Sequence, residues 1–260
     1  NLGNVLNKIN KFNDAIKNYD QAILINPDYA EAYYNRGTVL QDLKLYEEAH
    51  ESYTRAIKIK PNLNFLLGSL IYTKLYLCDW VSFYENLKIL EKMIIEGNKS
   101  LTPFSSLLFY NSSSLQKKVV EIYLSTKYSS QNIYKAINKN FKKNKIRIGY
   151  YSADFRQHVM SDLLIHLFQT HDKSKFELIG FSFKPGKPDD MHYKIKKSFD
   201  KFFDVSLKTD KEVAQLSADQ KVDIAVDLMG FTTHNRIGIF IEPCAPIKVN
   251  FLGYPGTLGS

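Results

Sequence analysis

Cysteine and long apolar runs are scarce in this sequence of 260 residues. The two cysteines, Cys78 and Cys244, lie far apart in the chain, which argues against a disulfide framework and against a zinc site. The longest uncharged apolar stretch, residues 63–73, is too short to span a bilayer. The chain also opens without the basic and apolar segments of a signal peptide. We therefore expect a cytoplasmic protein that does not cross a membrane.

The sequence also lacks the glycine-rich loops that bind phosphate groups in many proteins, because it holds neither a Walker loop nor a G-x-G-x-x-G segment. Its net charge is +8, from 35 basic and 27 acidic residues, and a basic chain can attract nucleic acid or phosphorylated ligands. The lysines are dispersed, however, and their densest cluster, residues 139–145, falls at a domain junction. We interpret them as solvated surface lysines and expect no nucleic-acid partner.

Residues 1–61 repeat with a period of 34, which is typical of tetratricopeptide repeats. The matched pairs are Gly3 and Gly37, Leu6 and Leu40, Phe12 and Tyr46, Ala15 and Ala49, Tyr19 and Tyr53, Ala22 and Ala56, and Pro27 and Pro61. Small residues let two antiparallel helices approach closely, aromatic residues fill the gaps between them, and proline ends the second helix. The alternative, two unrelated amphipathic hairpins, does not explain so many matches at one spacing.

A third, degenerate repeat follows, because Trp80 stands one period after Tyr46. The helices expected beyond the second repeat cover residues 65–77, 81–95, 103–108 and 114–126. We divide the chain into repeats over residues 1–96, a helical linker region over 97–144 and an α/β lobe over 145–260.

The last part alternates short β-rich runs with amphipathic helical runs, which is typical of a Rossmann-like domain. The expected strands cover residues 146–151, 176–183, 202–205, 222–228 and 247–252. The expected helices cover residues 161–169, 189–199, 210–218 and 237–241, the first with Leu163, Leu164, Leu167 and Phe168 facing inward. Strands connected in this way form a right-handed, doubly wound parallel sheet. The fold class is therefore a tetratricopeptide α-solenoid followed by a Rossmann-like α/β lobe.

Three loops leave the carboxyl ends of these strands, where folds of this kind bind ligands. They cover residues 152–158, 227–232 and 252–259, and they read Ser-Ala-Asp-Phe-Arg-Gln-His, Asp-Leu-Met-Gly-Phe-Thr and Leu-Gly-Tyr-Pro-Gly-Thr-Leu-Gly. With the repeats, the Cys-Asp-Trp segment at 78–80 and Arg236, they make the chain resemble the protein O-GlcNAc transferases, glycosyltransferase family 41, over residues 2–260. Each motif alone is weak, but three in this order behind these repeats are specific.

The resemblance implies a GT-B enzyme with two Rossmann-like lobes, of which the α/β lobe is the first. Such enzymes transfer N-acetylglucosamine from the donor substrate UDP-GlcNAc to Ser or Thr hydroxyls of proteins. They invert the anomeric centre and need no metal and no cofactor, and their repeats bind acceptor proteins along an asparagine-lined groove. By the same resemblance, His158 matches the active-site histidine of the first lobe, and Thr232, Leu252, Gly253 and Pro255 match loops that line the donor sugar.

The residues themselves support two catalytic candidates, His158 and Asp227. Transfer to a hydroxyl needs a group that accepts its proton, and an imidazole on a loop at the mouth of the sheet suits this task. The alternative for His158 is an exposed loop histidine, and for Asp227 it is a carboxylate that accepts hydrogen bonds from turn amides. Two positions depart from the family pattern: Asp162 replaces a second histidine, and Met229 replaces a residue that is polar in some relatives.

Relatives continue beyond the position of Ser260 into a second lobe that holds most of the nucleotide site. We therefore interpret the sequence as a fragment that lacks the C-terminal catalytic lobe and some N-terminal repeats. We expect it to be inactive alone and to bind UDP-GlcNAc weakly. Two alternatives stay open: a non-catalytic repeat module that binds proteins and carries a vestigial α/β lobe, and a transferase that uses another UDP-sugar.

Overall fold

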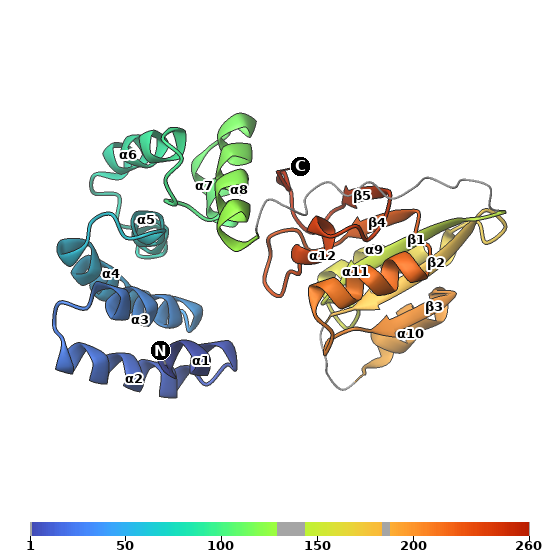
Figure 1. Cartoon of the computed structure of the whole chain (residues 1–260), viewed down its shortest axis with the longest axis horizontal. Coiled ribbons are helices and arrows are strands. Elements are labelled where there is room, and N and C mark those ends of the chain that lie inside the picture. Colours follow the sequence, from blue (N-terminus) through green and yellow to red (C-terminus); the bar gives the residue numbers. More distant parts are fainter. Residues whose placement is uncertain (1, 129–143, 184–187, 260) are drawn as a thin grey trace. The chain divides into compact units, whose positions relative to one another are not determined.

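Two compact units make up the chain, one ending at Leu124 and one beginning at Ser125. The computed structural model describes residues 2–128, 144–183 and 188–259 (Figure 1). Within these ranges, no helix is both long enough and apolar enough to cross a bilayer. Of the helical linker region expected over residues 97–144, residues 129–143 lie outside the described residues.

The first unit is built from helices, and the two regular repeats form as expected. The helices of these repeats are α1 (Leu2–Lys8), α2 (Phe12–Ile25), α3 (Ala30–Asp42) and α4 (Tyr46–Ile59). The helices that follow are α5 (Leu66–Tyr76), α6 (Phe83–Ile95), α7 (Pro103–Phe109) and α8 (Ser113–Lys127). In both regular repeats the period of 34 therefore corresponds to one helical pair (Figure 1).

A contact between glycine and tyrosine recurs in both regular repeats. A Cβ atom added at Gly3 would lie 2.7 Å from the ring of Tyr19, and one added at Gly37 would lie 2.7 Å from the ring of Tyr53. Both rings are buried. Since Cβ atoms do not approach other atoms this closely, only a residue without a side chain lets the two helices meet here. The expected close approach at glycine is confirmed.

The helices after the second repeat share one apolar core. Its buried members are Ile71, Leu90, Ile94, Leu101, Phe109 and Val119. Leu90 stands where the regular repeats carry alanine, and it is fully buried. Helix α7 begins with Pro103, directly after Thr102, whose hydroxyl accepts a hydrogen bond from the Ser105 amide. Helices α7 and α8, which lie in the region expected as a linker, thus pack with α5 and α6.

A five-stranded parallel sheet forms the centre of the second unit, in the order β3-β2-β1-β4-β5. The strands are β1 (Ile146–Ser152), β2 (Phe176–Ser182), β3 (Lys201–Asp204), β4 (Ile224–Asp227) and β5 (Ile247–Asn250). The helices between them are α9 (Val159–Thr170), α10 (Asp190–Ser198), α11 (Asp210–Asp219) and α12 (Gly238–Ile241). The expected parallel α/β lobe is confirmed. The strand order reverses between β1 and β4, and such a switch point is where folds of this kind bind ligands.

Two adjacent tyrosines of β1 show how helices cover both faces of the sheet. The ring of Tyr150 packs 5.0 Å from that of Phe168 in α9. The ring of Tyr151 packs 5.1 Å from that of Phe240 in α12, and its hydroxyl is hydrogen-bonded to Ser217 in α11. Because successive side chains of a strand point to opposite faces, α9 lies on one face, and α11 and α12 lie on the other (Figure 1).

One inward-facing residue of α9 was predicted wrongly. We expected Leu163 to face the core, but its side chain is 61% exposed. Leu164 and Phe168, four residues apart, are buried against the sheet instead. Leu163 precedes this stripe by one residue, which turns it about 100° away around the helix axis.

Candidate functional site

His158 begins helix α9 beyond the carboxyl end of β1. Its backbone is extended, and its Nδ1 atom accepts a hydrogen bond from the Met160 amide at 3.2 Å. This bond satisfies one of the amides that a helix leaves unpaired at its start. The side chain is 38% exposed, and its Nε2 atom makes no hydrogen bond with any described residue. One ring nitrogen of His158 is therefore engaged by the fold, and the other is open to a ligand.

Two charged groups lie beside His158 on the same loop. One carboxylate oxygen of Asp154 lies 3.8 Å from Nδ1 of His158, and the other lies 3.5 Å from Nη2 of Arg156. The Asp154 side chain is only 13% exposed. The Nε atom of Arg156 is buried and has no hydrogen-bond partner among the described residues. The loop after β1 therefore presents a carboxylate, a guanidinium and an imidazole close together.

The loop after β1 is held in place by α10. The Asp189 carboxylate accepts hydrogen bonds from the Gln157 amide at 2.7 Å and from the His192 amide at 2.8 Å. These two amides hold the pKa of Asp189 below its ordinary value. A hydrogen bond of 2.9 Å also joins Nδ1 of His192 to the carbonyl oxygen of Phe155. The shape of the loop is thus fixed by an element outside it.

Asp227 ends strand β4 and is 2% exposed. Its Oδ1 atom accepts a hydrogen bond from the Met229 amide at 2.9 Å, whereas its Oδ2 atom is buried without a partner among the described residues. Burial raises the pKa of Asp227 to about 6, although the Met229 and Gly230 amides act in the opposite direction. These contacts match the alternative interpretation, a carboxylate that holds turn amides. A catalytic role for Asp227 stays a prediction.

The thioether of Met229 joins the loops after β1 and β4. Its sulfur lies 3.5 Å from Oγ of Ser152 and 3.4 Å from the amide nitrogen of Ala153. The side chain is 3% exposed. Thioether sulfur is a weak hydrogen-bond acceptor and also fills apolar space. The buried Met229 side chain therefore both packs between the two loops and accepts weak hydrogen bonds there. The residue that departs from the family pattern therefore has a structural role in this chain.

The turns after β4 and β5 meet where neither has room for a side chain. A Cβ atom at Gly253 would lie 1.8 Å from the carbonyl oxygen of Leu228. One at Gly230, which has a φ of +56°, would lie 2.2 Å from Cβ of Tyr254. The Tyr254 ring is buried and packs edge to face on Phe231, with 5.4 Å between ring centroids. Both glycines are required because the two turns are in direct contact.

Asn250 gives the turn after β5 its shape. Its Nδ2 atom donates to the carbonyl oxygens of Tyr254 at 2.9 Å and of Gly256 at 3.2 Å. Asn250 is the register partner of Asp227 on the neighbouring strand, and its Oδ1 atom is buried and unpaired among the described residues, like Oδ2 of Asp227. Sequence reasoning missed Asn250, because nothing distinguishes it from any other polar residue at a strand end.

The residues expected to line the donor sugar lie on these two turns. The Thr232 hydroxyl donates to the carbonyl oxygen of Met229 at 2.8 Å. Leu252 is 50% exposed and has a φ of +68°, and Pro255 is also exposed. Gly253 is half-buried between them. In the turn after β5, Leu252 and Pro255 are thus exposed, whereas Gly253 and Tyr254 pack closely against the turn after β4.

Arg236 anchors the loop after β4 through its guanidinium. The Nε atom donates a hydrogen bond to the carboxylate of Asp210 at 2.7 Å. Its Nη1 and Nη2 atoms donate to the carbonyl oxygens of Val205 at 2.9 Å and Lys208 at 2.6 Å. The guanidinium also lies over the ring of Phe183, 5.4 Å from the centroid. Arg236 therefore links the loop to the start of α11, and its place in the motif has a structural reason.

The three loops thus form one continuous edge of the sheet. The turns carrying Thr232 and Gly253 are in contact through Leu228, and the loop after β1 joins them through Met229. His158 lies at the far end of its loop. Within the described chain, its side chain is hydrogen-bonded to Met160 and paired with Asp154, and neither interaction reaches the other two turns.

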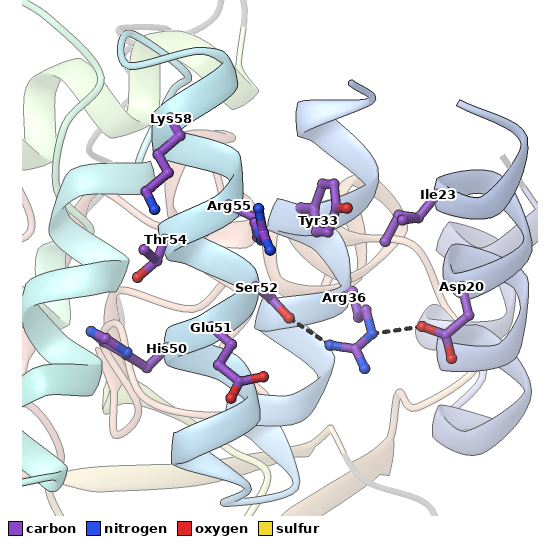
Figure 2. A pocket seen from close by; sticks show the side chains of 10 residues that line it. All are labelled: Asp20, Ile23, Tyr33, Arg36, His50, Glu51, Ser52, Thr54, Arg55 and Lys58. Carbon is purple, nitrogen blue, oxygen red and sulfur yellow. Dashed lines mark hydrogen bonds and ion pairs between the residues drawn. The ribbon is translucent and has the colours of Figure 1, made fainter. Parts of the chain in front are cut away.

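The repeats carry a polar cavity of about 660 Å³. It is lined by Asp20, Ile23, Tyr33, Arg36, His50, Glu51, Ser52, Thr54, Arg55 and Lys58 (Figure 2). Arg36 crosses it, pairing with Asp20 at 2.7 Å and donating to Oγ of Ser52 at 2.7 Å. These residues come from α2, α3 and α4, so two neighbouring repeats build the cavity.

The fold defines a tetratricopeptide-repeat protein with a Rossmann-like lobe, in which three loops meet at the carboxyl edge of the sheet. The chain belongs to glycosyl transferase family 41, whose family model matches residues 77–260. Two tetratricopeptide-repeat models match residues 3–44 and 30–63. The resemblance inferred from the motifs is confirmed.

Curated relatives include peptide glycosyltransferases of plants and animals. A probable UDP-N-acetylglucosamine–peptide N-acetylglucosaminyltransferase of Arabidopsis thaliana, SEC, is 31% identical over 116 residues, which are 45% of this chain and 12% of that protein. A UDP-N-acetylglucosamine–peptide N-acetylglucosaminyltransferase of Caenorhabditis elegans is 31% identical over 117 residues, 45% of this chain and 10% of that protein. The match thus spans about an eighth or less of these relatives.

A solved structure has the same fold over nearly the whole chain. An O-GlcNAc transferase variant from Thermobaculum terrenum matches with a TM-score of 0.67 at 18% identity. The match covers 99% of this chain and 50% of the other. It supports the arrangement of helical repeats followed by an α/β lobe.

Proposed function

We propose that the protein transfers N-acetylglucosamine from UDP-GlcNAc to Ser and Thr hydroxyls of other proteins. The observation that carries this proposal is the joined edge of three motif loops at the switch point of the sheet, within the part that matches family 41. The names of the Arabidopsis and Caenorhabditis relatives support UDP-GlcNAc as donor and a peptide as acceptor. Inversion of the anomeric centre and independence from metals and cofactors belong to the same proposal.

In this function the two glycine-packed turns hold the donor sugar. Thr232, Leu252, Gly253 and Pro255 lie on turns whose shape is set by buried neighbours, so their exposed atoms are fixed before a ligand arrives. Preorganised groups stabilise charge that develops on a leaving diphosphate better than mobile groups do. His158, with its unengaged Nε2 atom, is the side chain proposed to meet the reacting groups.

The repeats hold the acceptor protein in this proposal. Tetratricopeptide repeats are an architecture for binding polypeptides, because stacked helices expose a continuous surface. The polar cavity between α2, α3 and α4 offers side chains that can bond to an acceptor backbone.

The test is transfer by the native protein, purified from the cells that make it. We expect it to attach N-acetylglucosamine from labelled UDP-GlcNAc to Ser or Thr of cellular proteins, as located by mass spectrometry. His158→Ala should lower the rate by about 10²–10³-fold, the range for removing one positioned hydrogen-bond donor at the reacting centre. Transfer of another sugar in place of N-acetylglucosamine would overturn the donor assignment. No transfer from any UDP-sugar would favour a protein-binding module.

A further inference from the structure

We propose that His158 works as a hydrogen-bond donor through Nε2 and not as a proton acceptor, and that Asp154 is the positioning residue that holds the charged ring by its Nδ1 proton. This inference rests on the proposed function, because it names what the site histidine does there. It follows from the two contacts of Nδ1, which leave Nε2 carrying hydrogen in both protonation states of the ring.

In the neutral ring, the cap of helix α9 decides the tautomer. The Met160 amide donates to Nδ1 at 3.2 Å, so Nδ1 must present a lone pair. A neutral imidazole has one nitrogen with hydrogen and one without, so the hydrogen resides on Nε2. The opposite tautomer would set the N–H of Nδ1 against the N–H of Met160 and leave a helix amide unpaired.

In the charged ring, Asp154 takes over the contact to Nδ1. A proton on Nδ1 ends the bond from Met160, and the nearest anion is Oδ2 of Asp154 at 3.8 Å. Its other oxygen faces Arg156 at 3.5 Å, so the carboxylate stands between two cations. The charged ring again has hydrogen on Nε2. In neither state does Nε2 present the lone pair that a general base needs.

Other charged groups near the loop are already engaged. Asp189 accepts from the amides of Gln157 and His192, and Asp162 lies 3.4 Å from the amide nitrogen of the Gln157 side chain. Neither is hydrogen-bonded or ion-paired to the His158 ring, so Asp154 remains its one carboxylate partner in the described chain. Nε2 can therefore donate a hydrogen bond to an oxygen atom of a substrate.

The test is nitrogen NMR of the histidine rings in the 260-residue polypeptide, which needs no activity. Two-bond nitrogen–proton correlations separate the two tautomers, and His158→Asn identifies the His158 signals among those of the six histidines. We expect a protonated Nε2 and an unprotonated Nδ1 in the neutral ring. The ring of His166, exposed on the same helix, is the matched control and should show the tautomer mixture of a free imidazole. A protonated Nδ1 in neutral His158, or a mixture like that of His166, would overturn the proposal.

The role of Asp154 is tested in the charged ring. In acid, where the ring is charged, the Nδ1 proton should exchange with water several-fold faster in Asp154→Ala than in the parent chain. An unchanged exchange rate would remove Asp154 from the proposal. The Nε2–H tautomer should persist in this variant, because the Met160 bond does not involve Asp154. Its loss would also count against the proposal. Failure of sugar transfer leaves these signals unaffected, so the two proposals can fail separately.

Discussion

Asp227 should make the second unit less stable as the pH rises. Its ordinary pKa is 3.8, and burial raises the pKa in the folded chain to about 6. The folded state therefore binds this proton more tightly than the unfolded state does. The stabilisation is fully present below the unfolded pKa and is lost as the pH rises through the folded value. About two pKa units at 1.36 kcal/mol each correspond to a loss of about 3 kcal/mol.

Asp227→Asn should abolish this loss. Asparagine keeps an oxygen that can accept from the Met229 amide, and it carries no charge at any pH. Residue 227 is also the register partner of Asn250, whose Oδ1 atom lacks a partner among the described residues. The new side-chain amide would add a hydrogen-bond donor beside it. Relative to the parent chain, the variant should gain about 3 kcal/mol in free energy of unfolding between about pH 4 and about pH 8. Asp219→Asn, which removes an exposed carboxylate of α11, should show no such gain.

The assay must report on the second unit alone. The single tryptophan, Trp80, lies in the first unit, so its fluorescence follows the wrong unit. Cys244 is fully buried in the second unit, whereas Cys78 is exposed in the first. In a Cys78→Ser background, urea-dependent labelling of Cys244 therefore measures unfolding of the α/β lobe. Variant and parent are compared at equal pH, so the intrinsic reactivity of the thiol cancels. A free-energy difference that does not change with pH would refute the reasoning.

Three further substitutions test the packing. Gly253→Ala should destabilise the second unit by about 3 kcal/mol or more in the Cys244 assay, because its Cβ would overlap the Leu228 carbonyl, which is backbone. Gly37→Ala should destabilise the first unit by about 1–3 kcal/mol, followed by tryptophan fluorescence, because the buried Tyr53 ring must move. Arg236→Gln should destabilise the second unit by about 2–3 kcal/mol in the Cys244 assay, since charged hydrogen bonds to three residues are lost. Losses under about 0.5 kcal/mol would contradict each argument.

The repeats and the sheet could be predicted because their signals are local. The spacing of Gly37 and Tyr53 encodes a contact inside one helical pair, and each strand is a short apolar run. The orientation of Leu163 could not be predicted, because three leucines and a phenylalanine crowd one short helix and any of several stripes fits. Which of them is buried depends on how α9 lies on the sheet.

The candidate site was predictable as a set of loops and not as a set of contacts. The motifs placed His158, Thr232 and Gly253 on loops at the carboxyl edge, which the strand order accounts for. The pairing of Asp227 with Asn250 depends on strand register, which sequence spacing does not encode. The hydrogen bond from Met160 to His158 is local, but it appears only once the start of α9 is known.

Each glycine–tyrosine contact joins two helices of a single repeat. The packing inside a repeat therefore does not depend on which repeat precedes or follows it. A duplicate of residues 30–63 inserted at its own boundary would carry its internal fit with it, as the equal approaches of 2.7 Å at Gly3 and Gly37 illustrate. Duplication of a repeat can therefore lengthen the solenoid without changing the helix–helix contacts inside any repeat.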